Sequence, residues 1–142
     1  MQKKLILIVC MANYCRSPVA EIILRHHYKH NFEFISAGIS PIAKSGMDPR
    51  SIKFLESKGY KSHIHTPRKI NNKLISQADK VYVLDIQLLF KMNQIYKNYS
   101  SKFFLLNHHE KDLSLRDPYH LEINEYNDVL KRLEKVCQSL VI

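Results

Sequence analysis

A cysteine and an arginine, Cys10 and Arg16, are separated by five residues and lie between an apolar run and a helix-like segment. The apolar run is Leu5-Ile6-Leu7-Ile8-Val9, and Ser17-Pro18 follows the arginine. A strand, a tight loop and a helix start in this order bring several backbone N–H groups to one spot, where the helix dipole adds positive potential. The sequence therefore predicts an anion-binding loop with a thiol at its base and a guanidinium at its rim. Such a loop indicates phosphate chemistry through a cysteine nucleophile.

The residue types in this loop suit a bound phosphate dianion. Successive N–H groups of a curled loop contact several oxygens at once, and the planar fork of Arg16 grips two of them. The same positive potential favours the nucleophilic thiolate form of Cys10, and the Ser17 hydroxyl can donate to that sulfur. Asn13 suits a left-handed loop position, and Pro18 suits a first helical turn, where its missing N–H is not needed. The alternative is a buried cysteine at a strand end beside an unrelated surface arginine.

A second segment, Asp117-Pro118-Tyr119, offers the proton donor that phosphate ester cleavage needs. A phenol has a pKa near ~10, so its expulsion at neutral pH is slow unless a side chain protonates the leaving oxygen. Pro118 disfavours helical geometry at Asp117, and Tyr119 offers an aromatic wall to a flat substrate. The segment predicts a general acid at Asp117. Taken alone, the segment is more typical of an ordinary Asp-Pro turn ahead of the last helix.

Together the two segments resemble a known family, the low-molecular-weight protein tyrosine phosphatases, and the resemblance runs over nearly the whole chain. Residues 9–18 match the phosphate-binding loop of that family, and residues 117–119 match its general-acid loop. The order and spacing of four shorter segments make the resemblance specific. These segments are Ser36-Ala37-Gly38, Asp48-Pro49-Arg50, His65-Thr66-Pro67-Arg68 and Val83-Leu84-Asp85.

The resemblance implies a protein-tyrosine-phosphatase that hydrolyses phosphotyrosine through a cysteinyl-phosphate intermediate. Cys10 is then the nucleophile, and Arg16 binds the equatorial oxygens and stabilises the transition state. Asp117 is then the general acid, and afterwards the base toward the hydrolytic water. Neither a cofactor nor a metal is implied.

The resemblance also implies residues that bind the substrate or support the loop. Ser17 tunes the thiolate, and Asn13 holds the loop in shape with Ser36 and His65 as supporting partners. Tyr119 lines the mouth of the pocket. The implied substrate-binding residues are Met11, Ala12, Asn13, Tyr14, Cys15, Ser17 and Tyr119.

Three residues depart from the usual pattern of the family. Ala12 stands where the family usually has glycine, so the loop is strained or reshaped if that position needs a positive φ. Tyr14 replaces a smaller residue, often isoleucine or threonine, and is expected near the pocket wall, where it narrows or redirects substrate choice. Ile42 falls near a position where many relatives carry a large aromatic side chain, so the second pocket wall is left undefined.

Several alternatives to a phosphotyrosine phosphatase stay open. A protein-arginine-phosphatase of the same fold is the nearest, although Tyr14 differs from the threonine associated with that activity. An arsenate reductase would need additional cysteines after the third strand, and residues 78–109 contain none. A non-catalytic phosphate-binding domain is disfavoured because Cys10, Arg16 and Asp117 are all present. A nucleic-acid-binding domain would show strongly salt-dependent binding.

The cysteine content argues against a secreted disulfide framework. Cys10, Cys15 and Cys137 are odd in number and irregularly spaced. The resemblance implies a reversible disulfide between Cys10 and Cys15, but an inert buried neighbour is equally compatible with the sequence. Cys137 lies on an apolar stripe of the last helix and is expected in the core. The first apolar run is too short for a secretion signal or a membrane span, so we expect a cytoplasmic protein, with leaderless secretion still open.

Charge and histidine content bear on the partners. The net charge is +9, with 22 Lys+Arg against 13 Asp+Glu. The cations are scattered without interleaved aromatics, so we expect a solvated basic surface and no nucleic acid. His26, His27 and His30 lie in one predicted helix, yet no Glu or Cys pattern completes a zinc site, and no metal is expected. The resemblance implies a tyrosine-phosphorylated protein as the partner, such as a bacterial tyrosine kinase or a host protein.

Apolar runs alternate with helical patterns along the chain. Strands are predicted at 5–9, 32–36, 80–84 and 102–105, and helices at 19–29, 49–58, 72–78, 86–95 and 123–139. This alternation predicts an α/β fold with a parallel sheet covered on both faces and the site at its carboxyl edge. The resemblance implies four strands in the order 2-1-3-4, a flavodoxin-like three-layer sandwich. We expect one domain over residues 1–142 and a monomer.

Asp79 and Asp85 flank the third strand and are expected as caps, with Asp85 a candidate support of the active-site edge.

Overall fold

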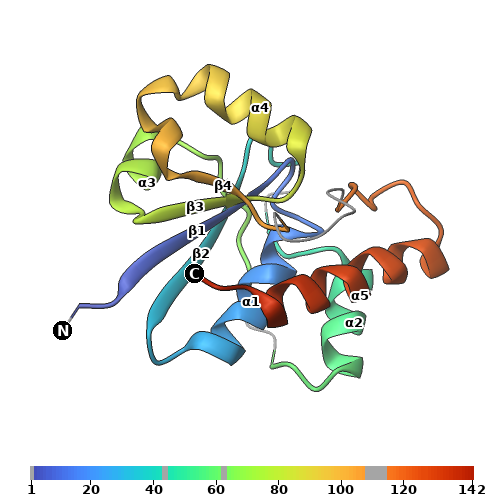
Figure 1. Cartoon of the computed structure of the whole chain (residues 1–142). Helices are drawn as coiled ribbons and strands as arrows, with labels where there is room; N and C mark the ends of the chain where they lie inside the picture. Colours follow the sequence, from blue (N-terminus) through green and yellow to red (C-terminus); the bar gives the residue numbers. More distant parts are fainter. Residues whose placement is uncertain (1, 43–44, 62–63, 108–114) are drawn as a thin grey trace.

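A parallel sheet of four strands forms the centre of the protein. The computed structural model describes residues 2–42, 45–61, 64–107 and 115–142. The strands are β1 (Lys4–Cys10), β2 (Phe32–Gly38), β3 (Lys80–Val83) and β4 (Phe103–Leu105), and their spatial order is β2-β1-β3-β4 (Figure 1). The predicted strand order is therefore confirmed.

Helices cover both faces of this sheet, as the α/β prediction requires. On one face lie α1 (Ser17–Tyr28), α2 (Pro49–Ser57) and α5 (Ile123–Ser139), with α5 packed against the other two (Figure 1). On the other face lie α3 (Asn72–Gln77), α4 (Ile86–Ile95) and a 3₁₀ helix, η1 (Lys97–Lys102). None of the helices in the described ranges is long and apolar enough to cross a lipid bilayer.

The apolar patterns in the sequence explain which surfaces are buried. Ile6, Leu7, Ile8 and Val9 in β1 have no exposed surface, because a central parallel strand is covered on both faces. The apolar stripe of α5 is buried along its whole length, and Cys137 lies in the core as predicted. Burial of this continuous run and this stripe fixes the sheet between its two helical layers.

The predicted boundaries differ from the observed ones where local contacts override periodicity. Helix α1 begins at Ser17, two residues earlier than predicted, because Pro18 is accommodated in its first turn. Helix η1 was not predicted, and it delays the start of β4 to Phe103. The Lys102 ammonium donates to the carbonyls of Ile75, Ser76 and Ala78 at 2.7–3.1 Å, so the end of η1 is held by the end of α3 rather than by its own pattern.

The sheet register brings the loop after β1 against the end of β2. Cys10 pairs with Gly38 at the carboxyl ends of the two strands. A Cβ atom at Gly38 would lie 2.7 Å from the backbone nitrogen of Asn13 and 2.9 Å from the carbonyl oxygen of Met11. Only glycine allows this approach, so Gly38 is what lets the loop after β1 pack directly on β2.

Candidate active site

The backbone of residues 10–16 forms a cradle whose carbonyl groups face outward. Five successive or near-successive carbonyls accept hydrogen bonds from groups outside the loop. The pairs are Cys10 with the N–H of Ile39, Met11 with the N–H of Ser40, Asn13 with the His65 ring, Tyr14 with the N–H of Asp48 and Cys15 with the Ser51 hydroxyl. In a planar trans peptide the next N–H points opposite to the carbonyl. The N–H groups that follow these carbonyls therefore face the inside of the loop, where an anion binds.

The sulfur of Cys10 lies at the base of this cradle and accepts two hydrogen bonds. The cysteine is 2% exposed. The Asn13 N–H lies 3.2 Å from the sulfur, and the Ser17 hydroxyl oxygen lies 2.9 Å from it. The Asn13 side-chain amide donates to that same hydroxyl oxygen at 2.8 Å, which leaves the hydroxyl proton available to a thiolate at Cys10. Two donors aimed at one sulfur stabilise a thiolate.

Asn13 joins the cradle to three other parts of the chain. Its φ of 52° is in the left-handed region, as its residue type predicts. Its side chain donates to Ser36 at 3.0 Å and accepts from the backbone N–H of Arg68 at 3.0 Å. The His65 Nε2 atom lies 2.8 Å from the Asn13 carbonyl oxygen, which requires the proton to be on that nitrogen. Ser36 in turn donates to the buried carboxylate of Glu21 at 2.9 Å.

The two unusual residues of the loop do not distort it. Among the residues that the structure describes, Asn13 is the only non-glycine with a positive φ, so Ala12 occupies ordinary backbone geometry. The strain considered for Ala12 is therefore absent. Tyr14 is half-buried, and its ring meets the ring of Tyr119 edge-on with centroids 6.2 Å apart. Tyr14 therefore contacts Tyr119, the aromatic side chain expected at the mouth of the pocket.

The Arg16 guanidinium is held at the rim by the end of β3. Its Nη1 atom forms an ion pair with Asp85 at 2.8 Å and donates to the Leu115 carbonyl at 2.6 Å. These two bonds use both Nη1 protons, and among the described residues no group occupies the Nε–Nη2 edge, which suits an anion as a planar fork. Asp85 also caps α4, because its other oxygen accepts from the Leu88 N–H at 2.9 Å. Both expectations for Asp85, helix capping and support of the site, match its contacts.

A hollow of about 170 Å³ opens above the cradle. It brings together these residues named from the sequence: Cys10, Met11, Ala12, Cys15, Arg16, Asp117 and Tyr119. Ile42 and His120 complete its lining. The Asp117 carboxylate is exposed in this wall, and it accepts from the Tyr119 N–H at 3.1 Å, which shapes the turn. The wall that lacks the usual aromatic residue is therefore formed by the aliphatic side chain of Ile42, 56% exposed.

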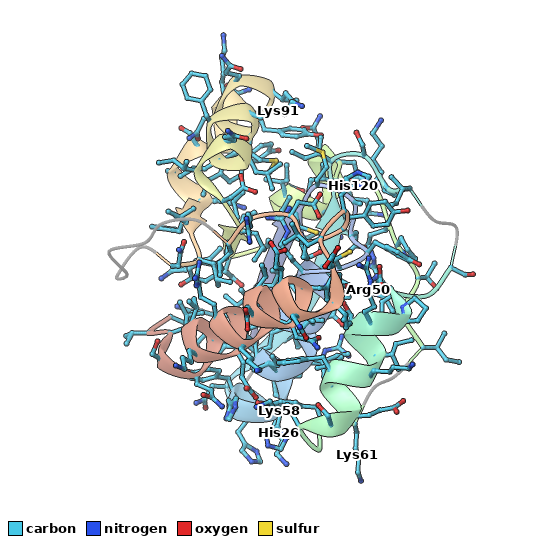
Figure 2. All side chains as sticks on the ribbon, turned by 90° about the vertical axis from the view of Figure 1, so that its right-hand side faces the viewer. His26, Arg50, Lys58, Lys61, Lys91 and His120 are labelled. Carbon is cyan, nitrogen blue, oxygen red and sulfur yellow. The ribbon has the colours of Figure 1, made fainter. Side chains whose placement is uncertain are left out.

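Arg50 ties the Asp117 loop to the start of α2, a contact that sequence reasoning missed. Its guanidinium pairs with Asp48 at 2.7 Å and 3.0 Å and donates to the carbonyls of Tyr119 at 2.9 Å and Leu121 at 3.1 Å. Figure 2 shows Arg50 below His120 on one side of the molecule. Burial alone would raise the pKa of Asp48, but the hydrogen bonds and charge of Arg50 outweigh it and lower that pKa. The only sequence signal was the Asp-Pro-Arg helix start.

Cys15 is a buried thiol beside the reacting position. Burial raises its pKa to about 12, a Tyr126 hydrogen bond opposes this increase, and the Asp48 charge adds to it. Its Sγ atom donates to Asp48 at 3.8 Å. Cys10 and Cys15 are both free thiols in this structure, and their reversible disulfide stays a prediction.

The histidines of α1 contact an aromatic side chain. The rings of His26 and His27 lie 5.3 Å and 6.3 Å from the ring of Tyr60, whose hydroxyl donates to Glu134 at 2.7 Å. Within the described ranges, no three His, Cys, Asp or Glu side chains are grouped so that they could hold a metal ion.

Comparisons with known proteins agree with this geometry. The family model described as low molecular weight phosphotyrosine protein phosphatase matches residues 5–142. The low molecular weight protein-tyrosine-phosphatase Ptp of Acinetobacter johnsonii is 34% identical over 119 residues, covering 84% of this chain and 82% of that protein.

Two solved structures share the fold. The tyrosine phosphatase Wzb from Escherichia coli K30, in complex with sulphate, has a TM-score of 0.88 and 26% identity, covering 96% of this chain and 95% of that one. The YwlE arginine phosphatase from Geobacillus stearothermophilus has a TM-score of 0.87 and 24% identity, and the match covers 95% of this chain and 88% of that one. The sequence match over almost the whole chain, rather than the shared fold, decides the assignment. The chain belongs to the low-molecular-weight phosphotyrosine protein phosphatase family.

Proposed function

We propose that this protein hydrolyses phosphotyrosine in proteins, with Cys10 as nucleophile, Arg16 as transition-state clamp and Asp117 as general acid and base. The observation that carries the proposal is the Cys10 sulfur, which accepts from the Asn13 N–H and the Ser17 hydroxyl at the base of an inward-facing N–H cradle. The Wzb structure, which is in complex with sulphate, supports anion binding in this fold.

In the first step the Cys10 thiolate attacks phosphorus. A sulfur–phosphorus bond forms as the bond from phosphorus to the tyrosine oxygen breaks. The tyrosine oxygen keeps the electron pair of the broken bond and takes a proton from the Asp117 carboxyl group. The N–H cradle and the Nε–Nη2 edge of Arg16 bind the equatorial oxygens. Because these donors are already in place before the reaction, they stabilise the transition state without reorganisation.

In the second step water releases phosphate from the enzyme. The Asp117 carboxylate takes a proton from a water molecule while the oxygen of that water attacks phosphorus. The sulfur–phosphorus bond then breaks. The electron pair returns to Cys10, where the Ser17 hydroxyl and the Asn13 N–H again stabilise the thiolate. The enzyme thus ends each cycle in its starting state.

The direct test is hydrolysis of p-nitrophenyl phosphate in reductant and EDTA, with and without vanadate. We expect turnover that EDTA leaves intact and vanadate blocks, because a phosphate-shaped anion competes for the same cradle. Absence of turnover in folded protein would overturn the proposal and favour a phosphate-binding domain.

The aromatic wall offers a stacking surface to the phenyl ring of phosphotyrosine. Tyr119 lines the hollow, and Tyr14 packs against it edge-on. The alternative activity, removal of phosphate from arginine, was associated with threonine at position 14. We therefore propose that Tyr14 directs the enzyme toward phosphotyrosine.

Comparison of one peptide sequence carrying either phosphotyrosine or phosphoarginine tests this choice. We expect wild type to prefer phosphotyrosine and Tyr14→Thr to lose roughly 2- to 13-fold in kcat/KM on it, since an aromatic pair contributes about 0.5–1.5 kcal/mol. Tyr14→Phe serves as the control, because it keeps the ring contact. Preference of wild type for phosphoarginine would contradict the proposal.

Arg50 is a positioning residue for the Asp117 loop in this mechanism. Arg50→Lys keeps the charge but loses the planar fork that joins Asp48 to the carbonyls after Asp117. We expect kcat on phenyl phosphate to fall roughly 10- to 100-fold, because misplacing the acid by about 1 Å costs that much.

The double variant separates positioning from stability at this site. If Arg50 acts through Asp117, Arg50→Lys adds little to the loss already caused by Asp117→Asn. An equal loss on all leaving groups would contradict the positioning role.

We further propose that residues 1–142 form one phosphatase domain that acts in the cytoplasm on tyrosine-phosphorylated protein. The match of the family model to residues 5–142 supports the extent of the domain. A bacterial tyrosine kinase and a host protein both stay candidates for the substrate.

A further inference from the structure

A second and larger groove lies beside the candidate active site. Its volume is about 560 Å³, against about 170 Å³ for the hollow above Cys10. The two spaces share Met11, Arg16 and Asp117 in their linings, so they adjoin each other. The groove therefore lies within reach of the parts of a substrate that project from the Cys10 site.

Helix α4 presents an apolar face to this groove. Its inner side buries Leu88 and Met92 on the protein core. Its outer side carries Ile86, 55% exposed, and Phe90, 66% exposed, which are four residues apart and so share one helical face. Both line the groove. Two large apolar side chains that are exposed together beside a reaction site indicate a contact surface for a ligand.

The rim of the groove is positively charged. Lys91 on α4 and Arg116, next to Asp117, both line it. Figure 2 shows Lys91 above His120 on the same side of the molecule. The two acidic residues in the lining, Asp85 and Asp117, are accounted for, since Asp85 pairs with Arg16 and Asp117 is assigned to proton transfer. Arg116 forms an exposed ion pair with Glu125 at 3.4 Å, so Lys91 is the cation of the lining that most favours an anionic ligand, in keeping with the net charge of +9.

We propose that this groove binds the residues next to the phosphotyrosine of a protein substrate, with an apolar side chain over Ile86 and Phe90 and an acidic one beside Lys91. This inference rests on the proposed function of the Cys10 site. The adjacency of the two spaces, the apolar face and the cationic rim together favour an extended acidic-apolar segment. The groove makes the enzyme selective among phosphotyrosine proteins.

The test uses two phosphotyrosine peptides that differ only beside the phosphorylated residue, one with leucine and glutamate and one with alanine and lysine. The readout is kcat/KM on each peptide divided by kcat/KM on p-nitrophenyl phosphate, which is too small to reach the groove. We expect wild type to prefer the leucine-glutamate peptide. Phe90→Ala should lower the kcat/KM ratio for the leucine-glutamate peptide about tenfold. Lys91→Glu should reverse the preference between the two peptides.

Ile86 and Ile95 provide a matched pair of variants. Both lie on α4 and are 55% exposed, but only Ile86 lines the groove. Ile86→Ala should lower the peptide ratio, whereas Ile95→Ala should leave it unchanged. Because all these side chains are on the surface, the variants are expected to fold.

Three results would overturn the inference in distinguishable ways. Equal ratios in wild type, Phe90→Ala and Lys91→Glu, with p-nitrophenyl phosphate still hydrolysed, reject the groove and leave the proposed function standing. A wild type that forms a dimer dissociated by Phe90→Ala assigns the apolar face to a second copy of the chain instead. A wild type that hydrolyses no p-nitrophenyl phosphate rejects the proposed function itself.

Discussion

Cys10→Ser is expected to abolish phosphate ester hydrolysis while phosphotyrosine peptide still binds. The substitution replaces the sulfur nucleophile with a hydroxyl, so the first bond to phosphorus does not form. We expect kcat to fall on the order of 10⁴- to 10⁶-fold, as for loss of the nucleophile in other enzymes of covalent catalysis. The N–H groups of the cradle and the Arg16 fork are unchanged, so binding measured by calorimetry should stay close to that of wild type.

Arg16→Lys is the complementary variant for this prediction. It keeps a positive charge at the rim but removes the fork and the paired contacts of Nη1 with Asp85 and Leu115. It should therefore weaken peptide binding as well as turnover, unlike Cys10→Ser. Thermal unfolding of both variants, with and without inorganic phosphate, checks that each is folded. Hydrolysis by Cys10→Ser above about one hundredth of the wild-type rate would place the nucleophile elsewhere.

Asp117→Asn is expected to slow cleavage of phenyl phosphate and phosphotyrosine by roughly 10²- to 10⁴-fold. An amide is the same size as the carboxyl group but has no acidic proton to give to the leaving oxygen. The loss should shrink for p-nitrophenyl phosphate, whose leaving group is a much weaker base and needs less protonation. Steady-state kinetics on a series of aryl phosphates measures this dependence directly.

Asp128→Asn is the matched control for the acid. Asp128 is an exposed carboxylate of α5 that lines neither the hollow nor the groove, so its removal should change no rate in the series. If Asp117→Asn slows all aryl phosphates equally, Asp117 has a structural role, such as the turn it forms with the Tyr119 N–H.

The elements of the fold were predictable because their signals are local. The unbroken apolar run of β1 and the stripe of α5 are visible within a few residues, and both are buried as predicted. The cradle was predictable for the same reason, since Cys10, Arg16 and the helix start follow one another directly. Helix η1 was missed because it depends on the contact of Lys102 with the end of α3. The spacing of apolar residues in the sequence does not indicate such a contact.

By itself the sequence determined the cradle, the alternation of strands and helices, and the residue types that face phosphate. The tertiary structure alone decided which distant residues hold the residues of the site in place. Arg16 and Asp85 are 69 positions apart, as are Arg50 and Tyr119. The groove beside α4 likewise exists only because the sheet order sets the ends of β1 and β3 side by side. Such contacts depend on the packing of whole elements, and local patterns carry no information about the distance between residues that are far apart in the chain.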